Sequence, residues 1–188
     1  ESFARCPYQH FASYGLRPQQ LKTQDLSSLD LGDLFHGVFE GVLNAIKERG
    51  PEGLSDWEAS FDQVFEAICA ENERFGYSPK NLYFKGRLKG VVKRALGMAV
   101  THLRESQFKN CYNELTFGIG LSAQAPPLTL ETTGGAKVVL EGKVDRIDAY
   151  QGEEGCYVSI LDYKSSKQAL ALKDIFHGLK LQLMLYLD

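Results

Sequence analysis

Apolar residues in the first two-thirds of the chain recur with the period of an α-helix. In "LGDLFHGVFEGVLNAI", residues 31–46, they return every three or four positions and so share one helical face; a Gly-Pro pair then predicts the end of this helix. The segment "SDWEASFDQVFEAICAENERFG", residues 55–76, predicts a second amphipathic helix, opened by a capping box of Ser55 and Glu58. A third helix is expected over about residues 79–108, in two pieces if its glycines interrupt it.

The last third of the chain has the pattern of β-strands. The stretch "LTLETTGGAKVVLEGKVDRIDAY", residues 128–150, predicts a strand, a Gly-Gly turn and a long strand. After the turn "QGEEG", the segment "CYVSILDYK" predicts another strand, and a final helix is expected from about residue 173. A weaker strand pattern covers residues 114–121. Helices followed by a strand meander predict an α/β domain in which helices pack on a mixed sheet.

Length and composition fit one ordinary domain with a packed core, at 188 residues and 44% hydrophobic. We therefore expect a single domain over residues 1–188, mainly helical over 1–110, with the strand meander and the last helix in 111–188. The chain starts without Met, in a segment that has the pattern of a helix interior, and ends on an amphipathic segment. These features suggest a piece of a longer protein.

Charge and hydropathy exclude some classes of protein and leave others open. The net charge of −3 argues against a uniformly basic nucleic-acid coat, but it permits a local basic groove. Lys85, Lys89 and Lys93 recur at helical spacing, as a solvated helix face or a track for phosphates would. No apolar run approaches the roughly 20 residues of a membrane helix, and no signal region is visible. We expect a soluble, intracellular protein with no membrane partner.

A strand end carries an acid and a base on one side. In "SILDYKSSK", Asp162 and Lys164 are two positions apart and so point to the same face. The preceding strand of the hairpin brings Asp145 to that face if Asp145 pairs with Ile160 or with Asp162 itself. Either register leaves the two carboxylates about 5 to 8 Å apart.

A cation is expected between carboxylates this close. At about 7 Å they repel by roughly 2 kcal/mol for an effective dielectric constant near 20. Lys164 alone would neutralise them in a structural salt-bridged cluster. A divalent ion is the alternative, because close carboxylate oxygens are what Mg²⁺ or Mn²⁺ binds, and Lys164 would then act on a water or a phosphate.

An acid on one strand and acid-x-Lys on the next resemble the PD-(D/E)XK nuclease superfamily. "LFHGVFE", with His36, and "LQLMLYL", with Gln182 and Tyr186, resemble motifs of its RecB-like branch. "CPYQHFASYGL", with Cys6, resembles the opening of the nuclease domain in helicase-nuclease subunits of the AddB type. The resemblance implies a restriction-endonuclease-like core, a mixed sheet flanked by helices, with an N-terminal helical part.

The resemblance also implies residue roles. Lys164, Asp162 and Asp145 would be catalytic, with Lys164 positioning and activating the attacking water. One or two Mg²⁺ or Mn²⁺ ions would be held by His36, Asp145, Asp162 and the carbonyl group of Tyr163. Residues expected to hold DNA or support the site are Gln182, Tyr186 and Glu114. The other histidines, His10, His102 and His177, have no such support and are expected to be structural or surface residues.

The cysteines bear on an iron-sulfur cluster. In AddB-type and Cas4-like relatives, a cysteine placed like Cys6 joins three others that follow the Q-x-x-x-Y helix, and together they hold a [4Fe-4S] cluster. Cys69, Cys111 and Cys156 are wrongly placed to substitute for those three. No cluster is expected within these 188 residues, and one is expected only in a full-length parent.

The favoured hypothesis is a metal-dependent DNA exonuclease domain of a helicase-nuclease of the AddAB or RecBCD type. Such a complex processes linear double-strand ends for recombinational repair in the bacterial cytoplasm, with an AddA-type partner and a single strand in the nuclease site. The alternatives are a stand-alone Cas4-like exonuclease and a catalytically silent nuclease-fold module that only binds DNA.

Overall fold

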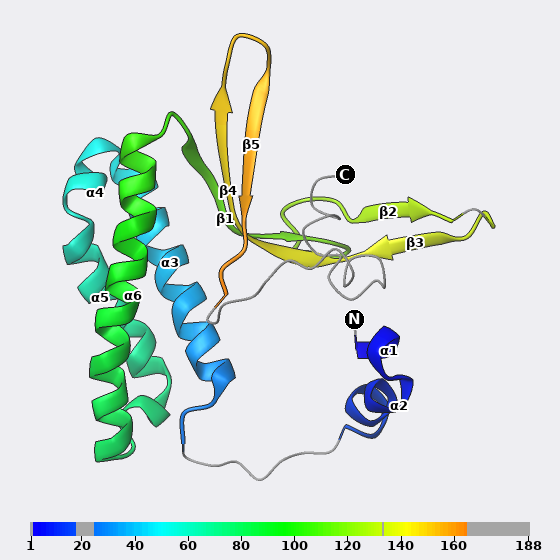
Figure 1. Ribbon diagram of the computed structural model, residues 1–188, viewed down its shortest axis with the longest axis horizontal. Helices are drawn as coiled ribbons and strands as arrows, with labels where there is room; N and C mark the ends of the chain where they lie inside the picture. The colour runs from blue at the N-terminus through cyan, green and yellow to red at the C-terminus, as the bar shows by residue number, and fades with distance from the viewer. Residues whose placement is uncertain (1, 18–24, 133, 165–188) are drawn as a thin grey trace. The chain divides into compact units, whose positions relative to one another are not determined.

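Helices and strands occupy successive parts of the chain, as the hydrophobic pattern predicts (Figure 1). The computed structural model describes residues 2–17, 25–132 and 134–164. It divides into two units, residues 25–165 and residues 1–24 with 166–188, which are considered separately. Within the second unit the described elements are α1 (Ser2–Arg5), α2 (Pro7–His10) and η1 (Phe11–Leu16). Gln182, Tyr186, His177 and the expected final helix lie outside the described residues.

The larger unit opens with a layer of helices. Its elements are α3 (Ser28–Arg49), α4 (Pro51–Ser55), α5 (Trp57–Glu71), η2 (Glu73–Phe75) and α6 (Pro79–Glu105). The three amphipathic helices predicted from the sequence are confirmed. The expectation that glycines might split the third helix is wrong, since α6 is continuous. None of the described helices combines the length and apolarity that a bilayer crossing requires.

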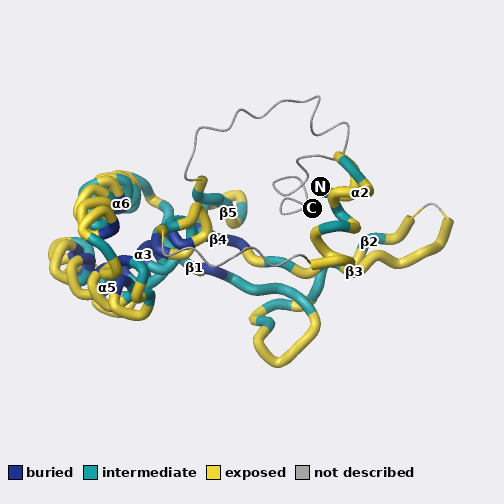
Figure 2. The backbone as a smooth tube through the Cα atoms, turned by 90° about the horizontal axis from the view of Figure 1, so that it is seen from below, coloured by how far each residue is buried: buried dark blue, intermediate teal, exposed yellow. Residues whose placement is uncertain are grey.

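The apolar faces of α3, α5 and α6 form the hydrophobic core. Figure 2 shows the buried positions gathered along these helices and continuing into the neighbouring strands. The fully buried side chains include Leu34, Val38, Val42, Phe61, Phe65, Val92 and Leu96. Each such side chain contributes about 1.5–3 kcal/mol on burial, so this layer is a stable support for residues that project from α3.

Helix starts differ from the sequence-based prediction. The capping box lies at Ser27 and Asp30, whose side chain also binds Arg74, with a shortest contact of 2.8 Å. The capping box expected at Ser55 and Glu58 is wrong. Pro51 starts an extra helical turn, α4, and the Ser55 hydroxyl donates to the Pro51 carbonyl within it.

The strands form two antiparallel ladders. A three-stranded sheet has the order β1 (Lys109–Phe117), β4 (Gly142–Gln151), β5 (Cys156–Leu161), and a two-stranded sheet pairs β2 (Leu128–Glu131) with β3 (Lys137–Leu140). The long strand predicted after the Gly-Gly turn is therefore two strands in two sheets, which part at Glu141. The weak strand predicted at residues 114–121 begins earlier, at Lys109, and ends at Phe117.

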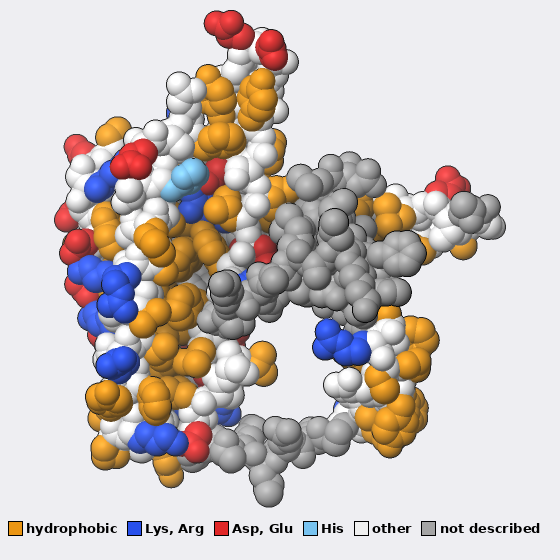
Figure 3. Space-filling view, viewed as in Figure 1, with side chains coloured by type: hydrophobic (Ala, Val, Ile, Leu, Met, Phe, Trp, Pro, Cys, Tyr) orange, Lys and Arg blue, Asp and Glu red, His pale blue; other side chains and the backbone are white. Residues whose placement is uncertain are grey.

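The lysine stripe of α6 pairs with acids of α5. Lys85 contacts Glu66 at 2.6 Å, Lys89 contacts Asp62 at 2.9 Å and Glu66 at 3.0 Å, and Lys93 contacts Glu58 at 2.6 Å. Figure 3 shows Lys and Arg side chains gathered over the helical layer, beside a run of hydrophobic ones. Because the lysines already have acidic partners, the structure favours the solvated helix face over the phosphate track.

Candidate metal centre

Three acids lie in a row across the three-stranded sheet. The register of β1 and β4 places Glu114 opposite Asp145. The last pair of the β4–β5 ladder, Arg146 with Leu161, is followed on the two chains by Asp145 and Asp162. Of the two registers expected from sequence, the structure therefore has the one that sets Asp145 opposite Asp162.

His36 of α3 reaches the first two of these acids. Its Nδ1 atom lies 2.8 Å from Glu114 Oε1 and 3.5 Å from Asp145 Oδ1. Ligand atoms of the three residues lie within 4.8 Å of one another, and among residues 2–17, 25–132 and 134–164 no other such group of three forms. One half-buried imidazole and two buried carboxylates are suitable ligands for a hard divalent cation.

Glu114 adopts an unusual backbone conformation to join this group. Its φ angle of 55° lies in the left-handed region, which costs a non-glycine residue about 1–2 kcal/mol. A regular strand would send neighbouring residues to opposite faces, yet Asn113 and Glu114 both contact α3. Asn113 donates to Asn44 at 2.8 Å, and Glu114 contacts His36. Backbone strain of this kind clusters at functional sites, which supports a functional role for Glu114.

The electrostatic environment of Asp145 is that of a cation site. Burial raises the pKa of Asp145 above its usual range. The backbone N–H of Tyr163, 2.6 Å from Oδ2, and the charge of His36 lower this pKa, while the charges of Asp162 and Glu114 raise it. A bound cation would offset both the burial and the repulsion, so protons and metal ions compete here.

Lys143 is a member of the site that sequence reasoning missed. Its Nζ atom lies 2.5 Å from Glu114 Oε2, and this hydrogen bond is the main cause of its raised pKa. The contact leaves the other oxygen, Oε1, facing His36. Its position two residues before Asp145, on the same strand face, was the signal that could have identified it.

Asp162 and Lys164 form the neighbouring part of the site. Lys164 Nζ lies 2.6 Å from Asp162 Oδ2, with the lysine side chain 42% exposed and the carboxylate 12% exposed. Asp162 is outside the group of three but close enough for its charge to raise the pKa of Asp145. The backbone N–H of Tyr163 contacts Asp145. Metal ligation by Asp162 and the Tyr163 carbonyl stays a prediction.

A buried ion pair fixes the far side of Tyr163. Arg146 binds Asp148 twice, at 2.8 Å and 2.5 Å, and both side chains are almost wholly buried. The third nitrogen of Arg146 donates to the Tyr163 hydroxyl at 3.4 Å, and the Tyr163 ring packs 4.4 Å from that of Phe39. Sequence reasoning missed this pair too, although alternating charges inside the strand "DRID" were visible. Arg146 thus supports the residue between Asp162 and Lys164.

Comparison with known proteins decides the family. A sequence model of the PD-(D/E)XK nuclease superfamily matches residues 1–188. The chain belongs to this superfamily. The superfamily and the fold class predicted from sequence are therefore confirmed, and the acids and lysine of the PD-(D/E)XK pattern are Asp145, Asp162 and Lys164.

Relatives with assigned names point to one kind of helicase-nuclease component. The chain is 36% identical to the AddB component of the ATP-dependent helicase/deoxyribonuclease of Alkaliphilus oremlandii over 197 residues, and 35% identical to that of Alkaliphilus metalliredigens over 195. It is 35% identical to the protein of the same name in Pelotomaculum thermopropionicum. In each case the match covers 100% of this PD-(D/E)XK chain but 17% of the relative.

Proposed function

We propose that this chain is a metal-dependent deoxyribonuclease domain that acts as an exonuclease on DNA ends. The observation that carries the proposal is the convergence of His36, Glu114 and Asp145 beside Asp162 and Lys164, in a chain of the PD-(D/E)XK superfamily. A structural salt-bridged cluster would explain Asp162 with Lys164. It does not explain an imidazole set against two buried acids, one of which has a strained backbone.

The donor set fits Mg²⁺ or Mn²⁺. Carboxylate oxygens and one imidazole nitrogen are ligands that such ions accept, and the described residues bring no thiol to the site. His36, Glu114 and Asp145 would hold the ion, with Asp162 and the Tyr163 carbonyl as further ligands. When bound, the ion would polarise the phosphate and lower the pKa of a bound water.

Lys164 has the position of the residue that acts on the reacting groups. Its ammonium group is half exposed beside Asp162, at the mouth of the site, so a DNA phosphate has access to it. A fixed positive charge there would orient the attacking water and stabilise charge that develops on the phosphate oxygens. Asp162 would hold the ammonium group in place between turnovers.

The larger assembly is also a proposal. The relatives are named as components of an ATP-dependent helicase/deoxyribonuclease, and this chain spans 17% of their length. We infer a bacterial, cytoplasmic complex with an AddA-type helicase partner that processes linear double-strand ends for repair and feeds one strand to this site. The [4Fe-4S] cluster would form only in the complete protein, with Cys6 as one ligand.

Cleavage of labelled linear single-stranded DNA in Mg²⁺ or Mn²⁺ tests the proposal. Asp145→Asn, Asp162→Asn and Lys164→Met should each lower the rate by at least about 10²-fold, the scale of losing one group that stabilises transition-state charge. Asp62→Asn, an exposed acid on α5, is the matched control and should leave the rate unchanged. DNA binding without cleavage by the complete protein, in either metal, would instead establish the silent module. Full activity with no helicase partner would favour the stand-alone exonuclease.

A further inference from the structure

A cavity of about 290 Å³ adjoins the candidate metal centre. It lies between α3, α6 and the segment that follows β5. Rings of Phe35, Phe39 and Tyr163 line it, and His36 and Lys164 bring polar groups to it. Two residues that belong to the metal site are therefore also walls of this cavity.

The cavity exists because small residues face each other across the two helices. Gly32 of α3 and Ala95 of α6 complete its lining. A Cβ atom added at Gly32 would meet nothing within 4 Å, so space is open there. Phe39 is only 4% exposed and its ring is covered by Tyr163, which leaves Phe35 as the ring with a free side.

We propose that this cavity, here called the base slot, receives the nucleobase next to the phosphate that is cleaved. The inference rests on the proposed function, because it requires a DNA phosphate at the metal site. A nucleotide joins an aromatic base to its phosphate, and the slot joins an aromatic wall to His36 and Lys164 in the same order. The base would stack on Phe35 while Lys164 faces the phosphate.

Size and chemistry limit what the slot holds. Pockets for drug-sized ligands span about 300–1,000 Å³, so a slot at the lower limit suits one base with part of its sugar. The described lining provides apolar walls and few hydrogen-bonding groups. Stacking is tolerant of sequence because every base has an aromatic face. The slot should therefore accept all four bases, as a nuclease that degrades DNA processively requires.

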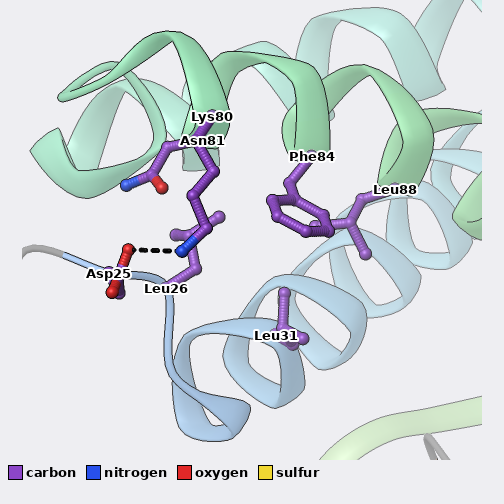
Figure 4. Close-up of a pocket in the computed structure, with 7 residues that line it drawn as sticks. All are labelled: Asp25, Leu26, Leu31, Lys80, Asn81, Phe84 and Leu88. Carbon is purple, nitrogen blue, oxygen red and sulfur yellow. Dashed lines mark hydrogen bonds and ion pairs between the residues drawn. The ribbon is translucent and has the colours of Figure 1, made fainter.

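A second cavity between the same helices offers a control. It measures about 250 Å³ and is lined by Leu26, Leu31, Phe84 and Leu88, with Asp25 and Lys80 at its rim (Figure 4). Lys80 is paired with Asp25 at 2.9 Å, and no residue of the metal group lines this cavity. Phe84 thus resembles Phe35 in chemistry and setting but has no link to the site.

Oligonucleotides with one abasic nucleotide at successive positions test the slot. With the complete protein and wild-type residues, an abasic nucleotide beside the scissile phosphate should raise KM by about 5- to 100-fold, the factor that about 1–3 kcal/mol of stacking represents. Phe35→Leu and Phe35→Ala should raise KM on intact DNA by a similar factor and be insensitive to the abasic position. Phe35→Trp should restore the wild-type pattern, and Phe84→Ala should keep it.

The outcomes separate the slot from the proposed function. Mn²⁺ affinity should be the same in wild type and the Phe35 variants, because Phe35 is not a ligand. If wild type cleaves DNA but Phe35→Leu and the abasic nucleotide act additively, the slot is overturned and the nuclease stands. If Phe35→Leu only lowers the thermal unfolding midpoint and leaves KM unchanged, Phe35 is a packing residue and the slot is again overturned. Absence of cleavage by wild type would overturn the proposed function and, with it, the slot.

Discussion

The same residue types, acids and cations, serve two different purposes in two regions of this molecule. On the α5–α6 surface, the acids that pair with lysines are 51% to 61% exposed. In the metal centre, the carboxylates of Glu114, Asp145 and Asp162 are only 5% to 12% exposed. Exposed pairs contribute little, typically about 0–1 kcal/mol, and are readily replaced. Charges kept in a buried place at a cost in free energy mark where chemistry is performed.

Breaking the buried pair of Arg146 should give the largest effect on folding. Arg146→Met leaves the Asp148 carboxylate buried without its partner and should lower the free energy of unfolding by about 3–5 kcal/mol. Urea denaturation of the purified protein measures this. The double variant Arg146→Met, Asp148→Leu should regain much of the loss, because no charge then stays buried. A loss below about 1 kcal/mol in the single variant would mean that this pair behaves like the exposed ones.

Asp30 is a buried acid of the opposite electrostatic kind to Asp145. Burial raises its pKa, but hydrogen bonds from Ser27, Asn72 and Arg74 outweigh this and hold the pKa well below 3.8. Asp30→Asn should lower stability at neutral pH by about 1.5–3 kcal/mol, as expected for hydrogen bonds to a charged group. A lowered pKa stabilises the fold above the unfolded value of 3.8 and loses that contribution as pH falls towards the folded value. The difference between wild type and variant should thus be constant from about pH 8 to about 5 and shrink below it, by thermal unfolding across pH.

Lys143 tests whether charges around the metal centre act on the metal. Lys143→Met frees the outer oxygen of Glu114 and should weaken Mn²⁺ binding by about 10- to 100-fold, the usual effect of losing a residue that orients a ligand. Titration calorimetry measures the affinity. Lys89→Met, which removes a lysine of the exposed surface, is the control and should bind Mn²⁺ as wild type does. Equal affinities in all three proteins would remove Lys143 from the site.

The exposed lysines should give the smallest effect. Lys85→Met, Lys89→Met and Lys93→Met should each change the free energy of unfolding by no more than about 1 kcal/mol. DNA affinity should stay the same at low and moderate salt, because the ammonium groups are already paired with Glu58, Asp62 and Glu66. Fluorescence anisotropy at several salt concentrations measures this. A fall of about one unit in the salt dependence per lysine would restore the phosphate track that the pairing argues against.

Much of the fold follows from local patterns in the sequence. The helical faces of α3, α5 and α6 are strongly periodic, and the turn before β5 fixes an antiparallel hairpin and hence the meeting of Asp145 with Asp162. Boundaries were harder. The break at Glu141 depends on which partner strand each half finds, and nothing local to residues 137–150 distinguishes the two halves. Ser55 was assigned to the wrong helix because a proline-led turn precedes α5.

The site divides in the same way. The spacing of Asp162 and Lys164 is a local signal, whereas His36 joins them from a helix more than a hundred residues away and was placed only by resemblance. Glu114 was expected near the site, but its left-handed backbone leaves no trace in sequence, since glutamate rarely adopts it. Lys143 and Arg146 were missed because their partners are set by packing across strands, which one sequence does not reveal.

The conformation of Glu114 has a consequence for engineering. A glycine or asparagine at this position would relax the main chain, so selection for heat resistance alone should discard the acid and disable the enzyme together. Screens for robust variants of this nuclease need an activity filter at this one residue. Conversely, a relative that carries glycine here would be expected to have given up cutting while keeping its architecture.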